Sequence, residues 1–437
     1  MVKPAVIGKD GRTTAITRTL RQSSRVKGDV PCLSPWKGKS GEAALREVLE
    51  AAREHRPDFV FVGPEEPLAE GVVDALQKIG IPCVGPTQEL ARLESSKAFT
   101  RRLLARHKIP GNPEHRIFTG LSGIESYLRE LREFVVKPDG LTGGKGVKVS
   151  GSHLVSIRDG VEYAEELFRA GHQAVVIEEK LDGEEFSLQS FCDGAHVVDM
   201  VVVQDHKRAE EGDRGPNTGG MGSYSCEDHR LPFLSEEDVR VASAINAAVA
   251  RALLLETGER YRGILYGGFM LTRHGVRLLE YNARFGDPEA LNILSLLKTD
   301  LVEICEGIIQ GTLDRVRVEF ERLATVCKYV VPKGYPDCPV KGERIDLDQV
   351  PKESDRLKYY FAAVDERPEG LYLTGSRAIG FVGIGATLDE AEEVAEKAAS
   401  AVGGPVYHRS DIGTRNLVRQ RLEHIRQIRG VSVAPRA

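Results

Sequence analysis

Short apolar runs that end in glycine alternate with amphipathic stretches through the first hundred residues. Three runs have the composition of buried strands: AVIG (5–8), DFVFVG (58–63) and IPCVG (81–85). Between them, apolar residues recur at helical spacing over 42–55 and 67–79. This alternation predicts a parallel sheet with helices on its faces. Ligands bind at the carboxyl ends of the strands in such sheets, and here those ends carry GKDG (8–11) and GPEEP (63–67).

The middle of the chain has a different pattern, in which strands, helices and one long polar connection are mixed. Two helices are predicted, at 95–107 and 159–169. Five runs are typical of strands: 134–138, 147–150, 174–181, 186–192 and 196–204. Residues 205–223 are polar and glycine-rich without a pattern of secondary structure, and such long connections are often functional lids. A helix (236–255) and a hairpin (263–282) with His-Gly at its turn follow.

The last hundred residues have the pattern of a small α/β unit. Strands are predicted at 324–332 and 377–385, followed by a helix at 388–401. A basic helix (414–429) comes after them. Because the chain has 437 residues, and domains usually have about 100–200, we expect two to four domains.

Composition excludes several classes of protein. Apolar residues make up 41% and charged residues 29%, as in ordinary globular proteins, and the net charge of −5 predicts neither nucleic acid nor a membrane as partner. The N-terminus turns polar too early for a signal peptide, and no apolar run has the roughly 18–20 residues that span a bilayer. The seven cysteines are scattered without a CxxC pair. We therefore expect a cytoplasmic protein with reduced cysteines, acting on small molecules as a monomer or homodimer.

The segment Lys137-Pro-Asp-Gly-Leu-Thr-Gly-Gly-Lys-Gly146 carries the strongest local sign of chemistry. A predicted strand delivers Lys137, a glycine-rich loop turns, and a second strand departs. Glycines let backbone N–H groups approach phosphate oxygens, and lysines supply the countercharge. The segment is not a Walker A loop, because GxxxxGK[ST] is absent and no helix follows. A plain glycine-rich hairpin is the alternative interpretation.

A second segment, Glu280-Tyr-Asn-Ala-Arg-Phe-Gly-Asp-Pro288, combines a carboxylate, an amide and a guanidinium. Strand alternation puts Glu280 and Asn282 on the same side, with Arg284 two residues further on. A carboxylate and an amide oxygen at this spacing suit a Mg²⁺ ion held mainly by nucleotide phosphates. Arginine can neutralise charge on a transferring phosphoryl group. A surface ladder of ion pairs is the alternative.

Two more polar segments are compatible with a nucleotide and a substrate. Residues 178–185 follow an apolar strand and could present backbone groups to adenine and a carboxylate to ribose, although acidic turns are common after strands. Residues 204–222 could fold over a substrate and keep water from an acyl phosphate, or could be a solvated loop. His206 in this segment is a candidate general base. The histidines show no metal-binding spacing such as HExxH.

Taken in order, these segments resemble the phosphoribosylamine–glycine ligase family, also called glycinamide ribonucleotide synthetases, of the ATP-grasp superfamily. The similarity is closest to archaeal-type members and extends from GPEEPL (63–68) to RSDIGT (409–414). It implies a mixed α/β and α+β fold with three domains. These are an N-terminal Rossmann-like parallel sheet (1–94), a two-part ATP-grasp module (95–320) with a nucleotide-binding subdomain inserted at about 115–185, and a small C-terminal α/β domain (321–437).

The resemblance also implies the ligands and the residues that bind them. The cofactors would be ATP and Mg²⁺ or Mn²⁺. ATP would be bound by Lys97, Lys137, Gly143, Gly144, Lys145, Glu178, Leu181 and Glu185, and the metal by Glu280 and Asn282. The catalytic residues would be Lys137, Arg284 and Asp213. The substrates would lie among Gly8, Gly11, Arg12, Pro64, Glu65, Asn217, Thr218, Gly219 and Gly220.

In the reaction that the resemblance implies, glycine attacks the γ-phosphate of ATP to form glycyl phosphate. The amine 5-phospho-β-D-ribosylamine then attacks the acyl carbon, giving glycinamide ribonucleotide, ADP and phosphate in de novo purine biosynthesis. Lys137, Arg284 and the metal would act mainly by positioning and electrostatics.

The chain departs from the family's first glycine-rich turn, which usually reads GxGGREHA. Thr13 and Thr14 stand in place of the Glu-His pair, and residues 30–41 lack a recognisable Pro-Gly-Asn loop. Three alternatives therefore stay open. They are a ligase with the same ATP half-reaction but another amine or amino acid, a nucleotide-binding protein without catalysis, and an ATP-grasp enzyme that carboxylates an amine with bicarbonate. Restoring Glu and His at positions 13 and 14 should improve use of phosphoribosylamine if the acceptor has changed.

Overall fold

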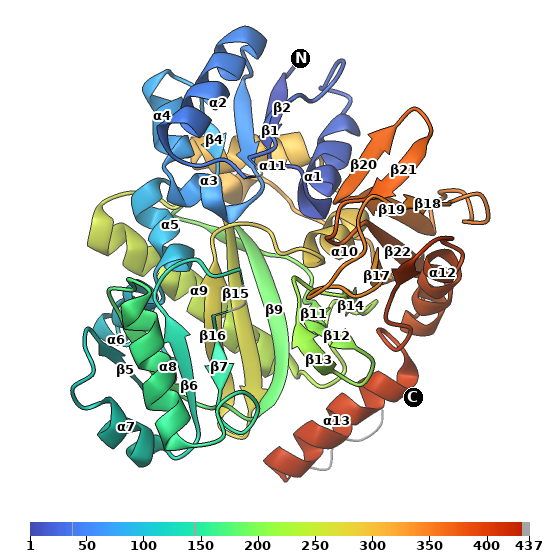
Figure 1. The fold of residues 1–437 in the computed structure, drawn as a ribbon. Coiled ribbons are helices and arrows are strands. Elements are labelled where there is room, and N and C mark those ends of the chain that lie inside the picture. Colours follow the sequence, from blue (N-terminus) through green and yellow to red (C-terminus); the bar gives the residue numbers. More distant parts are fainter. Residues whose placement is uncertain (37, 144–145, 431–437) are drawn as a thin grey trace.

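The computed structural model describes residues 1–36, 38–143 and 146–430. Four parallel strands form the N-terminal sheet in the order β2-β1-β3-β4: Cys32–Ser34, Pro4–Ile7, Phe59–Val62 and Cys83–Val84 (Figure 1). Four helices accompany it: α1 (Gly11–Arg21), α2 (Gly41–His55), α3 (Glu65–Ala69) and α4 (Val72–Lys78). β1 and β3 are buried along their whole length, as expected for parallel strands covered on both faces. The predicted parallel sheet is confirmed.

Two helices of this lobe differ from expectation. The single helix predicted at 67–79 is interrupted, because Gly71 adopts a left-handed backbone with φ 81° between α3 and α4. Helix α1, which begins directly after the glycine-rich turn, was not predicted. Asp10 caps this helix by accepting a hydrogen bond from the backbone of Thr13. An aspartate before the first helical turn is a helix-start signal that was present in the sequence.

The middle of the chain forms two antiparallel sheets. The smaller sheet has the order β5-β8-β6-β7 and comprises His115–Phe118, Val175–Glu179, Phe134–Pro138 and Lys148–Val149. Helices α7 (Ile124–Leu131) and α8 (Ile157–Arg169) pack on it and give it a hydrophobic core of its own. The larger sheet has the order β10-β9-β15-β16 and comprises Val197–Asp199, Gly183–Cys192, Gly263–Thr272 and Gly275–Asn282. Helices α5 (Gln88–Ser95), α6 (Lys97–Arg106) and α9 (Glu236–Thr257) lie against these sheets.

The strand predicted at 196–204 is divided between two sheets. β10 ends at Asp199, and the buried residues 200–203 follow without joining a continuous ladder. β11 (Gln204–Asp205) then pairs with β14 (Gly222–Ser225) in the C-terminal sheet. The apolar residues 200–203 therefore carry the chain from one sheet to the next, which explains why they have the composition of a strand.

The C-terminal sheet has the order β11-β14-β17-β22-β19, and β23 also pairs with β17. Its remaining strands are β17 (Ala324–Pro332), β22 (Ile379–Gly385), β19 (Leu357–Phe361) and β23 (Val406–Tyr407). Three short strands form a separate sheet: β18 (Arg344–Ile345), β21 (Gly370–Leu373) and β20 (Val364–Arg367). The helices of this half are α10 (Glu289–Leu296), α11 (Leu301–Gln310), α12 (Leu388–Ser400) and α13 (Arg415–Arg429), with a short 3₁₀ turn at Leu313–Arg315.

The polar segment 205–223 has more structure than the sequence suggested. β12 (Arg208–Glu210) and β13 (Arg214–Asn217) pair as a hairpin, and β14 follows. The strands β12 and β13 were missed because they consist of charged residues with an alanine, a glycine, a proline and an asparagine, rather than β-branched or aromatic residues.

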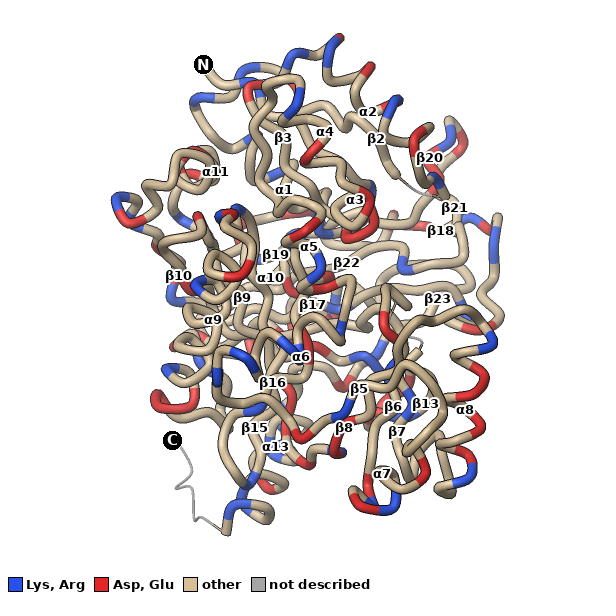
Figure 2. Tube along the Cα trace, turned by 90° about the vertical axis from the view of Figure 1, so that its left-hand side faces the viewer, with Lys and Arg blue, Asp and Glu red and all other residues tan. Residues whose placement is uncertain are grey.

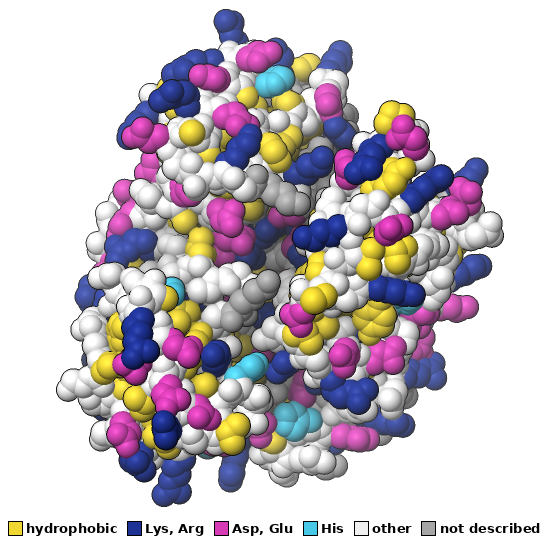
Figure 3. All heavy atoms as spheres, viewed as in Figure 1, with side chains coloured by type: hydrophobic (Ala, Val, Ile, Leu, Met, Phe, Trp, Pro, Cys, Tyr) yellow, Lys and Arg dark blue, Asp and Glu magenta, His cyan; other side chains and the backbone are white. Residues whose placement is uncertain are grey.

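The lobes meet around a central hollow. Figure 1 shows the N-terminal lobe above the two antiparallel sheets, with the C-terminal sheet beside them and α13 beneath the β12–β13 hairpin. Figure 2 shows basic and acidic residues interspersed along the whole trace. In Figure 3 the hollow between the lobes contains charged side chains. None of the described helices is long and apolar enough to cross a membrane.

Candidate active site

Lys137 and Lys97 reach the glycine-rich turn from two different elements. Lys137 stands on β6 just before the turn, and 8% of its surface is exposed. Lys97 opens α6, and its Nζ donates a hydrogen bond of 2.8 Å to the carbonyl oxygen of Gly140 in the turn. Burial lowers the pKa of Lys97, an effect that Glu280 opposes and the charge of Lys137 reinforces. Two ammonium groups thus lie beside the predicted phosphate loop.

The phosphate loop itself is described only in part. Gly143 has a left-handed backbone with φ 57°, a conformation that favours glycine. Gly144 and Lys145, which were predicted to cover the phosphates, lie outside the described residues. On the other side of the turn, Asp139 accepts hydrogen bonds from the backbone of Ala98 and from Ser96. The turn is therefore fixed to the start of α6, where Lys97 lies.

Glu178 is bound by two cations. Its Oε2 lies 2.7 Å from Nζ of Lys137, and its two oxygens accept from the guanidinium of Arg101 at 2.6 and 2.9 Å. Burial opposes ionisation of this carboxyl, but Arg101 and Lys137 lower its pKa to about 2. Arg101 was not predicted, because its place on α6 gives no local sign of the contact. Leu181, predicted to lie beside adenine, is half-buried just after β8.

Glu280 and Asn282 lie on one face of β16, as predicted, because the intervening Tyr281 is buried on the other. Oε1 of Glu280 lies 3.7 Å from Nζ of Lys207, and the same ammonium lies 3.7 Å from Glu185. Burial opposes ionisation of Glu280, but the charges of Lys207, Lys137 and Lys97 lower its pKa. The pair therefore offers an anionic and an amide oxygen, which fits a hard divalent cation that also takes phosphate oxygens. The described residues contain no group of three or more His, Cys, Asp or Glu side chains that could hold a metal ion.

Arg284, Glu65 and Arg12 form one network between the N-terminal lobe and the end of β16. Oε2 of Glu65 accepts from Nε of Arg284 at 3.0 Å and from Arg12 at 3.3 Å. Arg12 also donates to the carbonyl oxygen of Phe285 at 2.9 Å, and Arg284 pairs with Glu94 at 2.8 Å. These contacts bring together predicted substrate residues that are far apart in the sequence.

The two carboxyls that share Arg284 differ in pKa. Burial opposes ionisation of Glu65, but Arg284 and Arg12 outweigh burial and lower its pKa to about 2. Burial, reinforced by the charge of Glu65, raises the pKa of Glu94 to about 7 against the effect of Arg284. Glu94 also accepts a hydrogen bond from the backbone of Ala283, at 2.7 Å. No local pattern in the sequence indicated Glu94, which lies on the buried face of α5.

Asp287 connects the NARFGDP segment to the C-terminal domain. Tyr329 donates its hydroxyl to Oδ1 of Asp287 at 2.7 Å. Arg377 donates to the carbonyl oxygens of Asp287 and Gly219 at 2.8 and 2.7 Å, and to that of Gly220 at 3.1 Å. Arg377, which the sequence analysis did not identify, therefore ties the predicted acceptor loop to the end of β16.

Asp213 is held by cations rather than free. Its Oδ1 lies 2.8 Å from Arg409 and 3.5 Å from Nδ1 of His206, and its Oδ2 accepts from Arg421. Burial opposes ionisation, but these neighbours, His206 first, hold the pKa of Asp213 well below its usual range. Burial lowers the pKa of His206, an effect that its contact with Asp213 opposes. The catalytic role predicted for Asp213 stays a prediction, since every contact described suits a structural one. Asn217 ends β13, half-buried.

The first glycine-rich turn is closely packed. Gly8 has φ 118°, and a Cβ there would approach the Pro64 ring to 2.6 Å and Oγ1 of Thr13 to 2.7 Å. Thr13 is buried and donates its hydroxyl to Asp10 at 2.7 Å. A Cβ at Gly63 would lie 2.3 Å from the same hydroxyl. The side chain of Thr13 thus packs directly against Gly8 and Gly63. A larger side chain at position 13 would require the backbone at both glycines to shift.

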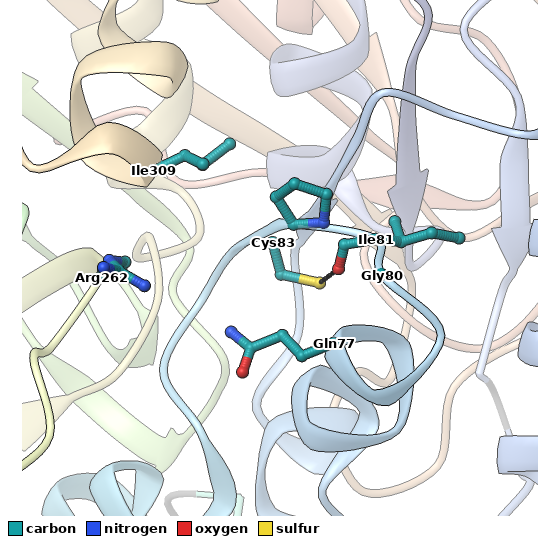
Figure 4. Close-up of a pocket in the computed structure, with 7 residues that line it drawn as sticks. Gln77, Gly80, Ile81, Cys83, Arg262 and Ile309 are labelled. Carbon is teal, nitrogen blue, oxygen red and sulfur yellow. Dashed lines mark hydrogen bonds between the residues drawn. The ribbon is translucent and has the colours of Figure 1, made fainter.

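A cavity of about 900 Å³ opens beside this turn. Its wall includes one face of α1 with hydroxyl and basic side chains, and the strands β2 and β19. The residues of this wall that could bind a polar ligand are Lys9, Thr14, Thr17, Arg18, Arg21 and Tyr359. Arg18 pairs with Glu353, and Arg21 pairs with Asp29. Figure 4 shows another, smaller cavity of about 230 Å³, between Gln77, Cys83, Arg262 and Ile309, which contains none of the predicted site residues.

Comparison with known proteins gives the same three parts in the same order. The family model for the phosphoribosylglycinamide synthetase N domain matches residues 2–94, that for its ATP-grasp (A) domain matches 95–290, and that for its C domain matches 325–415. The phosphoribosylamine–glycine ligase of Methanocaldococcus jannaschii is 46% identical over 98% of this chain and 100% of its own length.

Solved structures agree with this result. The crystal structure of phosphoribosylamine–glycine ligase from Thermotoga maritima matches with a TM-score of 0.77 and 28% identity, covering 94% of this chain and 100% of that one. The biotin carboxylase domain of 2-oxoglutarate carboxylase from Hydrogenobacter thermophilus, solved with MgADP, ADP and bicarbonate, matches with a TM-score of 0.72 over 98% of this chain and 94% of that one. At 13% identity, that likeness concerns the fold alone. The chain belongs to the phosphoribosylamine–glycine ligase family of ATP-grasp ligases.

Proposed function

We propose that this enzyme joins glycine to 5-phospho-β-D-ribosylamine through glycyl phosphate, forming glycinamide ribonucleotide, ADP and phosphate. The observation that carries the proposal is the position of Glu65 between Arg12 and Arg284. Arg12 lies at the start of α1, directly after the first glycine-rich turn, whereas Arg284 follows the strand with Glu280 and Asn282. The carboxylate of Glu65 therefore connects Arg12, which is expected near the amine, with Arg284, which is expected near the phosphoryl group.

The nucleotide would lie between the two antiparallel sheets. Lys137 and Lys97 would neutralise the phosphates, and Glu185 would accept from the ribose hydroxyls. Glu280 and Asn282 would hold Mg²⁺ or Mn²⁺, which supplies charge neutralisation at the phosphates when it is bound. Arg284 would face the carboxylate of glycine and the transferring phosphoryl group. Its pairing with Glu65 and Glu94 fixes the guanidinium before substrate arrives, so less reorganisation is needed during the reaction.

The amine would enter from the cavity beside α1. Threonine hydroxyls and the basic side chains of Lys9, Arg18 and Arg21 provide donors for a phosphorylated sugar. The hairpin β12–β13 and residues 217–220 would cover the other side and keep water from the acyl phosphate. The domain limits we propose are 1–94, 95–320 and 321–437, with the nucleotide-binding subdomain at about 115–185. We further propose that the enzyme acts in the cytoplasm, as a monomer or homodimer.

Product formation tests the proposal directly. The purified protein is given MgATP and glycine, with and without freshly generated phosphoribosylamine, and ADP and glycinamide ribonucleotide are measured. We expect ADP release that needs both substrates and yields one ribonucleotide per ADP. Absence of the ribonucleotide by mass spectrometry, despite ADP release, would reject this acceptor.

A ligase with another amine acceptor is the second candidate, and Thr13 and Thr14 favour it. The close packing of Thr13 against Gly8 and Gly63 means that a glutamate cannot simply be restored at position 13. Thr14 is less enclosed, and its hydroxyl lies 2.8 Å from the carbonyl oxygen of Phe361. Thr14→His is therefore the more informative variant. An increase in phosphoribosylamine use would favour a changed acceptor, whereas ADP release with glycine and a different amine in the wild type would establish it.

A further inference from the structure

Helix α13 starts at Arg415, where the match to the family's C domain ends. Leu417, Val418 and Ile425 form its buried face, and the helix packs against β9 and β15 of the larger ATP-grasp sheet. Figure 1 shows it running beneath the β12–β13 hairpin. The last helix of the C-terminal domain thus reaches back to the sheet of the nucleotide site.

Arg421 on the inner side of α13 joins two parts of the active site. Its Nε lies 3.3 Å from Glu184 on β9, and its NH2 group donates to Asp213 at the tip of the hairpin. Glu184 is almost fully buried and directly precedes Glu185, the proposed ribose ligand. His424, one helical turn further on, lies 2.6 Å from the other oxygen of Glu184. The hairpin and the sheet are therefore held by one guanidinium.

A second contact comes from the segment just before α13. Arg409 is fully buried, and it donates to Asp213 at 2.8 Å and to the carbonyl oxygen of Arg208 at 3.0 Å. Asp411 accepts from both remaining groups of Arg409 and from the backbone of Gly212 at 2.9 Å. The strand β12 and the turn of the hairpin are thus attached to the C-terminal segment.

The base of the hairpin is connected to the predicted nucleotide and metal residues through Lys207. The backbone N–H and the hydroxyl of Thr218 both donate to the carbonyl oxygen of Lys207, at 2.7 and 2.8 Å. The ammonium of Lys207 lies between Glu280 and Glu185. A hairpin that moves away from α13 would therefore also move Lys207 and the loop at 218–220.

We propose that α13 holds the β12–β13 hairpin closed over the site, with Arg421 as the positioning residue. The proposal rests on the proposed function, because closure matters where glycyl phosphate must be kept from water. Water that attacks glycyl phosphate returns glycine and phosphate, so ADP is released without an amide. If Arg421 positions the hairpin, weakening its contact with Asp213 should increase the amount of ADP released per amide product formed.

The test compares Arg421→Met and Arg421→Lys with Arg419→Met. Arg419 lies on the same helix with 68% of its side chain exposed and pairs within the helix with Glu423, so it serves as the matched control. We expect Arg421→Met to raise the ratio of ADP to amide product severalfold and to raise the KM of the amine. Arg421→Lys should restore part of the coupling, and Arg419→Met should match the wild type. A smaller folded fraction would lower ADP and product equally, so the ratio separates positioning from stability.

Hydrogen exchange provides a second measurement that does not need turnover. Amides of residues 208–217 should exchange faster in Arg421→Met than in Arg419→Met, while those of β9 and β15 change little. A ratio of ADP to product equal to that of the wild type, together with unchanged exchange in the hairpin, would overturn the proposal. If the wild type makes no ribonucleotide, the proposed function fails, and the exchange result alone then decides whether Arg421 positions the hairpin. If Arg421→Met does not fold, the same two measurements on Arg421→Lys decide.

Discussion

Nζ of Lys137 lies 2.7 Å from Oε2 of Glu178, inside the protein and beside the predicted phosphate loop. The lysine that is expected to bind phosphate therefore has a carboxylate partner of its own. Arg101 shares that carboxylate, so one buried anion faces two cations. Glu178 therefore orients Lys137 without cancelling the positive charge for phosphate, because Lys137, Arg101 and Glu178 together carry a net charge of about +1.

The first prediction concerns Glu178. Glu178→Gln leaves Arg101 and Lys137 buried without their countercharge, and breaking a buried ion pair typically costs about 3–5 kcal/mol. We expect a large drop in the urea midpoint of unfolding and a raised KM for ATP. Glu179→Gln, on the next residue of the same strand and partly exposed, is the control and should change the midpoint little. Equal midpoints for the two variants would show that the buried pair contributes nothing to stability.

The second prediction concerns the charge of Lys137. Lys137→Met keeps the volume of the side chain but removes the ammonium, and we expect ATP-dependent turnover to fall by orders of magnitude with the fold intact. Lys148→Met is the matched control, because Lys148 pairs with Val136 across the sheet and its ammonium lies over the ring of Tyr163. Steady-state ADP release and circular dichroism of both variants provide the check. Near-normal activity of Lys137→Met would reject its assignment to the phosphates.

The third prediction is a pH dependence caused by Glu94. Its pKa is about 7 in the folded protein, above the ordinary 4.5, so the folded state keeps a proton that the unfolded state loses between these values. Stability from this group is therefore complete below pH 4.5 and lost as pH rises through about 7. Glu94→Gln removes this loss, on the order of 1–3 kcal/mol, while its amide oxygen can still accept from Ala283. Urea unfolding at pH 5 and pH 8 measures it.

Glu65 serves as the internal comparison for that experiment. Its pKa is about 2 in the folded state and the ordinary 4.5 in the unfolded state, so both lie below pH 5 and the group adds little slope between pH 5 and 8. The wild type should therefore lose more stability than Glu94→Gln from pH 5 to pH 8. Parallel losses in the two proteins would mean that Glu94 is already ionised at pH 5.

Local motifs predicted those parts of the site that depend on neighbouring residues. Lys137 before a glycine turn, and Glu280 with Asn282 on one strand face, follow from the two-residue period of a strand, and the structure has both strands as expected. The fold class, with its N-terminal parallel sheet, followed from the alternation of strands and helices. These features need only a short window of sequence.

Contacts between distant segments were not predictable in this way. Arg421 and Asp213 are 208 residues apart, and Arg101 and Glu178 are 77 apart, so no spacing rule connects them. A buried arginine on a helix has the same local pattern as one that faces solvent. The hairpin at 208–217 was missed because its pairing is stabilised by Arg409 and Asp411 from the far end of the chain rather than by strand-forming residues.

The last prediction concerns the contact between Gly11, at the first glycine-rich turn, and Tyr329 of the C-terminal domain. A Cβ at Gly11 would lie 1.9 Å from the hydroxyl of Tyr329, the group that donates to Asp287. Gly11→Ala should therefore cost about 1–3 kcal/mol through overpacking and lower activity by displacing Asp287. Tyr329→Phe removes the oxygen in the way, after which the nearest ring atom is 3.2 Å from that Cβ. The double variant should thus be more stable than the sum of the two single effects.

Urea midpoints of the two single variants and the double variant complete this cycle. Gly120→Ala is the control, since a Cβ there meets no atom within 4 Å and the glycine is not left-handed. Tyr329→Phe alone loses one hydrogen bond, worth about 0.5–1.5 kcal/mol, while Arg377 still pairs with Asp287 at 3.3 Å. Strict additivity would mean that the turn and Tyr329 do not touch. A positive coupling would establish that Gly11 and Tyr329 are in direct contact, because the hydroxyl of Tyr329 is the atom nearest to a Cβ at Gly11.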